Sequence, residues 1–237
     1  MNRRFFSPAP LQLGPLQLSG TEAHHLLHVL RATPGDEITL FDGAGGEFTA
    51  RVESTARKTV VCQILQARSV NRELPVELVL GVALPKGERQ RWLIEKATEL
   101  GVTRLVPVET SRSTQQHANN STDRLQRTVI ESSKQCGRNQ LMYISPTTSL
   151  DAFLRAAPAA SRRWMAHPQD ARATTAAVTP AMDSPTWLLV GPEGGFTENE
   201  TAQARTEGWQ IIDLGARILR VETAAIALTS LASLPIE

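Results

Sequence analysis

Short apolar segments alternate with helical patterns from about residue 76 onward, and this alternation is the strongest constraint on the fold. The apolar segment VELVLGVALPK precedes ERQRWLIEKATELG, in which Leu93, Ala97 and Leu100 share one helical face. The segments TRLVPVE, TWLLVG and QIIDLG are again apolar and are separated by further helical patterns. The last of these patterns is the apolar segment VETAAIALTSLASL. Buried strands that alternate with helices predict an α/β domain with a parallel sheet.

The first seventy residues follow a different pattern. Ser19 and Glu22 match a capping box that would open a helix reaching about Arg31. The segments EITLFDG, GEFTARVES and KTVVCQIL follow; they are short, rich in β-formers and separated by turn residues. We therefore expect a small β-barrel-like domain over residues 1–72 and the α/β domain over residues 73–237, joined at VNRELP.

Cysteine use and hydropathy exclude several classes of protein. The chain has two cysteines, Cys62 and Cys136, which is neither a disulfide framework nor a zinc pattern. His24 and His28 have a spacing that can bind zinc, but no third ligand accompanies them, so we expect no metal. The N-terminus has no apolar signal segment, and no apolar run approaches membrane-spanning length. We therefore expect a cytoplasmic protein with no membrane partner.

Charge is distributed unevenly along the chain. The formal net charge is +1, but residues 84–138 carry ten Lys and Arg against six Asp and Glu. Residues 1–72 carry eight against six, and residues 139–237 carry seven against ten. A basic bias in the first half fits a polyanionic partner such as RNA. A solvated surface without a partner explains the same bias equally well.

The segment GPEGGFTENE follows the predicted strand at 187–190. Pro192 restricts the backbone, whereas Gly194 and Gly195 permit positive φ and the close approach of a ligand. Thr197 and Glu200 match a capping box for the next helix. The segment therefore predicts a strand–loop–helix corner at the carboxyl edge of the sheet, where α/β proteins bind ligands. A tight turn with an incidental glutamate is the alternative.

A second corner is predicted at DLGARILRVETA. A strand ends at Leu214 and Gly215, a loop carries Arg217 and Arg220, and an apolar helix then begins with Glu222 in its first turn. A carboxylate there suits the helix dipole. Two corners at one sheet edge would build one pocket, whereas ordinary packing of the loop is the alternative.

Two basic segments are candidates for RNA contact. RRFF at residues 3–6 interleaves cations with aromatic rings that can stack on a base, although the residues alone favour packing of the rings on the barrel. SSKQCGR places Cys136 between Lys134 and Arg138. A nucleophilic cysteine also needs a base, and none is evident, so we favour polyanion contact.

The chain resembles the RsmE family of the SPOUT superfamily along nearly its whole length and in matching order. The resemblance rests on RRFF, HVLR with GDEITLFDG, LPKGERQRWLIEKATELGV, ESSKQCGR, LLVGPEGGFTENE and LGARILRVETA. Members of this family methylate N3 of a uridine in 16S ribosomal RNA with S-adenosylmethionine (SAM). The resemblance implies an N-terminal PUA-like RNA-binding barrel, a SPOUT parallel-sheet domain that contains a trefoil knot, and a homodimer.

The resemblance also implies which residues form the sites. The implied SAM-binding residues are Leu189, Gly191, Pro192, Glu193, Gly194, Leu214, Gly215, Ile218, Leu219 and Arg220. Arg220 is the expected stabiliser of the uridine anion, and Glu193 is expected to orient the base or accept its proton. Phosphate contacts are expected from Arg3, Arg4, Lys86, Arg112 and Arg138 of the RNA-binding surface. A non-catalytic RNA-binding protein and a related SPOUT enzyme acting on tRNA are the alternatives.

Overall fold

The computed structural model describes residues 3–113, 122–168 and 183–233, and its chain forms two compact units. The first unit contains Met1–Glu73 together with Ile130–Leu141, and the second contains Leu74–Val129 and Met142–Glu237. The sequence predicts a simple division between residues 72 and 73. The structure instead associates the segment 130–141 with the N-terminal part of the chain.

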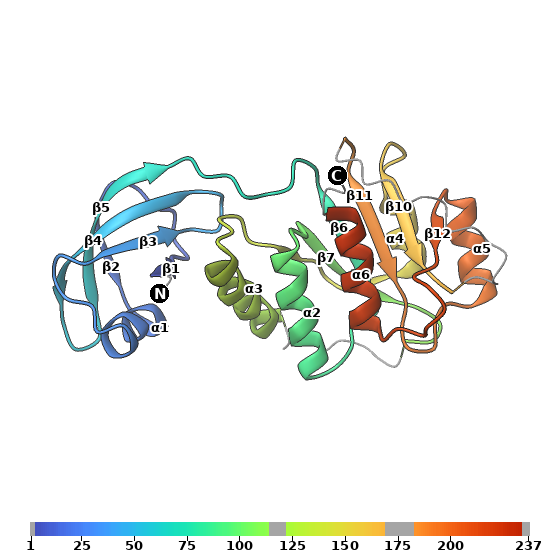
Figure 1. Ribbon diagram of the computed structural model, residues 1–237, viewed down its shortest axis with the longest axis horizontal. Helices are drawn as coiled ribbons and strands as arrows, with labels where there is room; N and C mark the ends of the chain where they lie inside the picture. Colours follow the sequence, from blue (N-terminus) through green and yellow to red (C-terminus); the bar gives the residue numbers. More distant parts are fainter. Residues whose placement is uncertain (1–2, 114–121, 169–182, 234–237) are drawn as a thin grey trace. The chain divides into compact units, whose positions relative to one another are not determined.

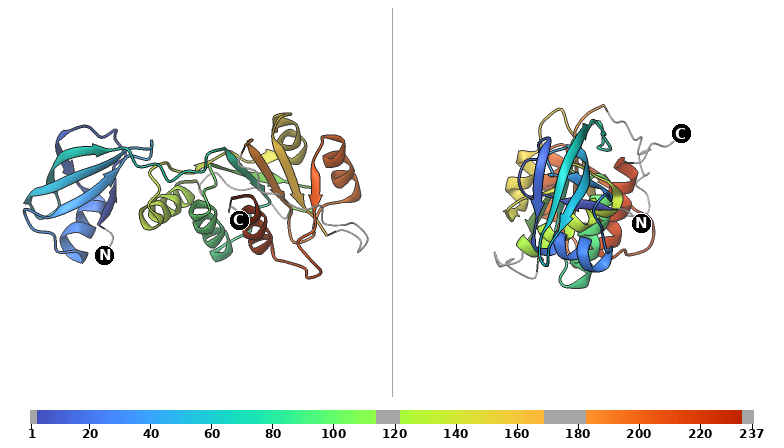
Figure 2. Two further views of the ribbon diagram at one scale, coloured as in Figure 1. Left: turned by 45° about the horizontal axis from the view of Figure 1, so that its top comes forward. Right: turned by 90° about the vertical axis from the view of Figure 1, so that its left-hand side faces the viewer.

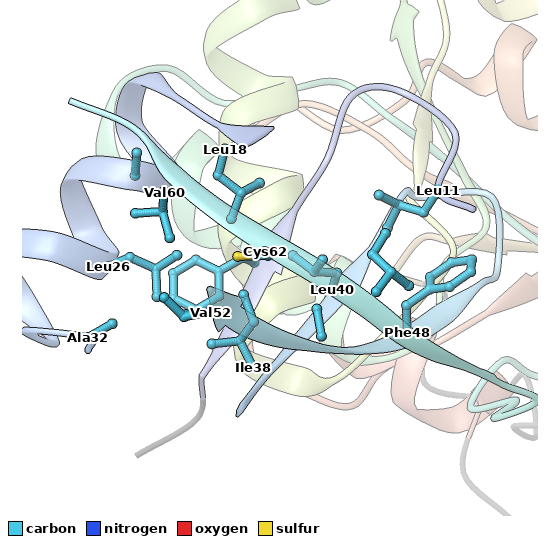
Figure 3. Packing of buried hydrophobic residues seen from close by; sticks show 14 residues of the cluster. Leu11, Leu18, Leu26, Ala32, Ile38, Leu40, Phe48, Val52, Val60 and Cys62 are labelled. Carbon is cyan, nitrogen blue, oxygen red and sulfur yellow. The ribbon is translucent and has the colours of Figure 1, made fainter. Parts of the chain in front are cut away.

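The first unit is a curved sheet closed over an apolar core (Figure 1, Figure 2). Its strand order is β1-β3-β4-β5-β2, in which β1 and β3 are parallel and the other neighbours are antiparallel. Side chains of Leu26, Ile38, Leu40, Val52 and Cys62 fill the space beneath the sheet, as Figure 3 shows. The elements are β1 (Arg4–Phe6), β2 (Gly14–Leu18), α1 (Gly20–His24), η1 (His25–Val29), β3 (Glu37–Phe41), β4 (Glu47–Thr55) and β5 (Val60–Arg68).

Buried ion pairs hold the segment 130–141 within the first unit. The Nε atom of Arg138 donates to Glu73 Oε2 at 3.0 Å, and Arg138 is only 4% exposed. Arg4 pairs with Glu47 at 2.6 Å and also donates to the side chain of Asn139. Each buried guanidinium therefore has a buried or half-buried carboxylate beside it, which offsets the loss of hydration.

The second unit is a parallel α/β sheet, as the alternating sequence pattern predicts. The strand order is β12-β10-β11-β6-β7-β8, with β9 paired to β7, and every neighbouring pair is parallel. Its strands are β6 (Leu78–Val82), β7 (Arg104–Glu109), β8 (Tyr143–Ile144), β9 (Thr148–Ser149), β10 (Arg162–Ala166), β11 (Thr186–Val190) and β12 (Gln210–Ile212). The helices are α2 (Glu88–Glu99), α4 (Leu150–Ala156), α5 (Glu198–Thr206) and α6 (Val221–Ser233). Helix α3 (Thr122–Cys136) belongs to this unit up to Val129 and to the first unit from Ile130 onward.

Helices cover both faces of this sheet, so its central strands are buried on both sides. Helices α2 and α6 pack against each other, and α6 lies on β6 and β11, while α4 lies on the opposite face (Figure 1). On that opposite face Phe153 packs so closely on Gly81 that an added Cβ would lie 2.3 Å from the Phe153 ring. Within the described ranges, none of the helices combines the length and the apolar character that crossing a membrane requires.

One of the two predicted capping boxes is wrong. Ser19 occupies the N-cap of α1 but makes no side-chain capping hydrogen bond, and Glu22 instead pairs with Lys134 Nζ at 3.0 Å. The predicted helix also changes from α to π geometry at His25. The capping box at Thr197 and Glu200 is confirmed.

The buried pair of Arg138 and Glu73 predicts a large loss of stability on substitution. In Arg138→Ala the Glu73 carboxylate keeps its buried position without its partner, so we expect the free energy of unfolding to fall by about 3–5 kcal/mol. Urea unfolding followed by circular dichroism measures this. Arg51→Ala is the matched control, because Arg51 forms an exposed pair with Glu37 and should cost at most about 1 kcal/mol. Equal effects of the two substitutions would contradict the structural role of Arg138.

Candidate functional site

The corner between β11 and α5 is built as the sequence predicts. Strand β11 ends at Val190, and the Thr197 side chain caps α5 by accepting from Glu200 N at 3.2 Å. The Phe196 ring lies against Gly191, where an added Cβ would be 2.8 Å from the ring. Gly195 has φ +66°, a left-handed conformation that favours glycine. The Phe196 ring therefore covers Gly191, whereas no side chain lies within 4 Å of the Cβ position at Gly195, where the chain turns.

The buried carboxylate of Glu200 ties this corner to the loop that follows β7. It accepts hydrogen bonds from Thr197 N at 2.7 Å and from Ser111 N at 2.8 Å. Burial acts to raise the pKa of Glu200, but these hydrogen bonds outweigh it and hold the pKa below its usual value. Arg112 from the same loop donates to Gly194 O at 2.7 Å. Two loops far apart in sequence are thereby held together.

The second corner lies between β12 and α6. Gly215 has φ +104° and its amide donates to Asp213 Oδ1 at 2.9 Å, which turns the chain away from the strand. The following loop leaves Ile218 94% exposed. An isoleucine this exposed is available to cover an apolar ligand.

The two corners and the end of β10 enclose one pocket, which we call the glycine pocket. Because neighbouring strands are parallel, these loops all leave the same edge of the sheet. The enclosed space is about 110 Å³, below the range of about 300–1,000 Å³ usual for small-molecule sites, so a larger ligand would extend into the open mouth beside Ile218. The lining residues are Ala166, His167, Pro168, Val190, Gly191, Pro192, Glu193, Gly195, Phe196, Asp213, Leu214, Gly215, Arg217, Ile218, Leu219, Val221 and Ala224.

The loop after β10 contributes a residue that the sequence analysis missed. His167 lines the glycine pocket, and its Nδ1 atom is buried and has no hydrogen-bond partner among the described residues. Burial, helped by the positive charges of Arg205 and Arg112, lowers the pKa of His167, so the imidazole is neutral near pH 7. An unpartnered buried nitrogen is a hydrogen-bonding site for a ligand. The sequence did contain a signal for this loop. Pro168 is the second residue after β10, just as Pro192 is the second residue after β11.

Most of the predicted cofactor residues lie in this pocket, but three lie elsewhere. Leu189 is fully buried in the sheet core, and Gly194 contacts Arg112 beside the pocket. Arg220 lines a neighbouring hollow with Glu88, Arg89, Trp92, Ile218, Leu219, Glu222 and Thr223, which we call the Trp92 hollow. The sequence alone did not separate these two spaces.

Glu193 is exposed at the rim of the glycine pocket. Its side chain is 59% exposed, and its Oε1 atom lies 3.7 Å from Arg89 Nη1. Together with Pro192, Glu193 also borders a second hollow that contains Lys86. In the part of the chain that the structure describes, no group of three or more His, Cys, Asp or Glu side chains could hold a metal ion.

The cations expected to contact RNA have different surroundings. Arg4 and Arg138 are buried in the ion pairs of the first unit. Arg3 is partly exposed and lies 3.0 Å from Asp36. Lys86 and Arg112 are exposed in the loops at the carboxyl edge of the parallel sheet. The structure thus leaves Arg3, Lys86 and Arg112 accessible and gives Arg4 and Arg138 internal partners.

This combination of fold and site defines an RNA methyltransferase. Residues 72–233 match the RNA methyltransferase domain family, and residues 18–65 match the RNA methyltransferase PUA domain family. The α/β domain and the N-terminal PUA domain predicted from the sequence are thereby confirmed, whereas the trefoil knot remains a prediction.

Individual relatives define the family more narrowly. The ribosomal RNA small subunit methyltransferase E of Synechocystis is 31% identical over 94% of this chain and 74% of its own length. The Bacillus subtilis protein of the same name is 28% identical over 88% of this chain and 86% of its own. The crystal structure of the Neisseria gonorrhoeae protein of that name, bound to S-adenosyl methionine, superposes with a TM-score of 0.87 at 32% identity, covering 97% of this chain and 96% of that one. The chain belongs to the ribosomal RNA small subunit methyltransferase E family.

The bridge through Glu200 predicts a specific dependence of stability on pH. Because the folded state lowers the pKa of Glu200 below the ordinary value of 4.5, its stabilising effect is complete above that pH and is lost as the pH falls through the lower folded pKa. Glu200→Gln should therefore reduce the free energy of unfolding by about 1–3 kcal/mol at pH 7, and the difference from wild type should shrink below pH 4.5.

Urea unfolding across a pH series measures this effect. Glu198→Gln is the matched control, since Glu198 is an exposed glutamate in the first turn of the same helix. A difference between Glu200→Gln and wild type that stays constant down to pH 3 would contradict the linkage.

Proposed function

We propose that the chain transfers a methyl group from SAM to N3 of a uridine in the 16S ribosomal RNA of the small ribosomal subunit, in the cytoplasm. The observation that carries the proposal is the glycine pocket, which lies at the carboxyl edge of the parallel sheet between two glycine-marked corners. The shared name of the relatives, ribosomal RNA small subunit methyltransferase E, supports the small-subunit RNA as substrate.

The residues of the glycine pocket fit SAM. The lining contains the apolar side chains of Val190, Phe196, Leu214 and Leu219, which suit an apolar adenine. Unpartnered His167 Nδ1 offers a hydrogen bond to a polar group of the cofactor. When bound, SAM would supply a methyl group already activated on a positively charged sulfur. The pocket residues then have mainly to orient it.

The uridine must be presented with its Watson–Crick edge free, because N3 lies on that edge. Its N3–H is weakly acidic, so a nearby cation that stabilises the developing anion assists the reaction. We assign this role to Arg220, which lies one residue beyond Leu219 of the pocket lining. Glu193 is the sequence-predicted group for orientation or proton acceptance, and its position at the pocket rim supports contact with the bound substrates.

Association into a homodimer is part of the proposal because the RsmE resemblance implies it. The apolar character of α6 is satisfied largely inside one chain, since Leu228 is buried and the helix packs on β6, β11 and α2. Leu234, which extends the apolar pattern, lies outside the described residues. Sedimentation velocity of the purified 25.9 kDa chain at micromolar concentration tests the dimer, and a single monomeric species would exclude it.

The reaction itself is tested by incubating the protein with methyl-labelled SAM and small ribosomal subunits that lack the modification. We expect label in 3-methyluridine after digestion of the RNA and mass spectrometry of the nucleosides. Label in another nucleoside would contradict the assigned target. Absence of both label and SAM binding by calorimetry would favour a non-catalytic RNA-binding protein.

The exposed Lys86 predicts a change in the salt dependence of RNA binding. A phosphate contact releases counterions, so Lys86→Ala should weaken RNA binding and reduce the slope of log K against log salt concentration by about 1. Filter binding at a series of salt concentrations measures the slope. Arg155→Ala, an exposed cation of α4 that already pairs with Asp151, is the control and should leave the slope unchanged. An unchanged slope in Lys86→Ala would remove Lys86 from the RNA surface.

A further inference from the structure

The Trp92 hollow lies beside the glycine pocket in the second unit. Ile218 and Leu219 line both spaces, so a ligand in one would be adjacent to a ligand in the other. The hollow has a volume of about 550 Å³ and lies between α2 and the start of α6. This volume falls within the range of about 300–1,000 Å³ typical of small-molecule sites.

A buried carboxylate without a partner forms part of its wall. Glu222 is 7% exposed, and its Oε2 atom is enclosed without any hydrogen-bond partner. The structure shows no ion pair between Glu222 and the described residues, although Arg89 and Arg220 line the same hollow. A buried carboxylate that lacks a partner destabilises the folded state. Because Glu222 also lines the open hollow, a ligand bound there would lie beside this residue.

The rest of the wall suits a nucleobase. Trp92 is 42% exposed, which is unusual for the largest apolar side chain, and its ring is accessible for stacking. Arg89 and Arg220 bring positive charge to the same hollow. An aromatic ring together with guanidinium groups is a common arrangement for holding an unstacked RNA base.

We propose that the Trp92 hollow holds the target uracil and that Glu222 is the base that accepts its N3 proton. The proposal rests on the proposed methyl transfer to uridine N3 and assigns the substrate side of that reaction. The N3–H proton passes to a Glu222 oxygen while its electron pair stays on nitrogen. That pair forms the bond to the methyl carbon, the carbon–sulfur pair leaves with the thioether product, and the Glu222 proton is released to water.

The chemistry of the wall distinguishes uracil from cytosine. Uracil presents one donor, N3–H, between two carbonyl acceptors, which complements one carboxylate among arginines. Cytosine has an unprotonated N3, so its lone pair would face the Glu222 carboxylate. Glu193 is less suited to the role, because it is 59% exposed and paired with Arg89.

The first test replaces Glu222 with glutamine, which keeps the volume and removes the charge. With unmodified small ribosomal subunits as substrate, kcat should fall by at least about 100-fold, and the residual rate should rise with pH because hydroxide must then remove the proton. The Kd of SAM by calorimetry should change less than about twofold.

Thermal unfolding without any ligand separates catalysis from a structural role. Because Glu222→Gln removes an unpartnered buried charge, Tm should rise by about 2–4 °C, whereas a structural carboxylate would lower it on substitution. Glu222→Gln also removes the favourable interaction of the carboxylate with the dipole of α6, and this loss lowers Tm. Glu198→Gln measures that contribution alone, since Glu198 occupies the first turn of α5 and is exposed.

The second test addresses the stacking surface. Trp92→Ala should lower kcat/KM for the subunit about 5- to 150-fold, as expected for one stacked base, while Trp92→Phe recovers most of the loss. Tyr143→Ala is the control, because Tyr143 is another exposed aromatic, 59% exposed on β8 and not among the residues that line the hollow. Sedimentation of Trp92→Ala should match that of wild type.

Three results would overturn the proposal while wild type still forms 3-methyluridine, so the proposed function would survive them. These are a kcat of Glu222→Gln within about threefold of wild type, a lowered Tm of that variant, and loss of self-association in Trp92→Ala with unchanged kcat/KM per dimer. The last result would assign the hollow to an interface between two copies. Absence of 3-methyluridine with wild type would instead refute the proposed function itself.

Discussion

The hydrogen bonds accepted by the buried carboxylate of Glu200 are the interaction on which the glycine pocket depends. Glu200 and Ser111 are 89 residues apart in sequence, and their contact fixes the loop after β7 against the loop after β11. The same carboxylate accepts from Thr197 N and thereby sets the start of α5. Helix propensity alone does not determine where a loop lies. Glu200 does so here, because it belongs to the capping box of α5 and also holds the loop after β7.

The sequence predicts this arrangement only in part, as the two capping boxes illustrate. The patterns at Ser19–Glu22 and Thr197–Glu200 are equivalent in sequence, yet only the second forms. At the first, Lys134 competes for the Glu22 carboxylate from more than a hundred residues away. A local pattern describes what a side chain can do, whereas its actual partner depends on which distant segment packs beside it.

The parallel sheet and both glycine corners were predictable because they rest on periodicity and turn chemistry, which are local. The surroundings of the charged side chains were not. Arg4 and Arg138 lie in basic segments that suggest RNA contact, but both are buried beside carboxylates. Glu222 was interpreted as an ordinary first-turn glutamate because the sequence shows neither its burial nor the absence of a partner.

The two units use buried charge differently. In the first unit Arg4 pairs with Glu47 and Arg138 pairs with Glu73, so their charges help to fix one arrangement of the sheet and the segment 130–141. In the second unit Glu222 has arginines near it and is paired with neither. A protein selected for stability alone would pair such a group or replace it with an apolar one. A carboxylate kept buried and unpaired beside an exposed tryptophan is instead what proton transfer from a stacked base requires, and the instability it causes is a consequence of that chemistry.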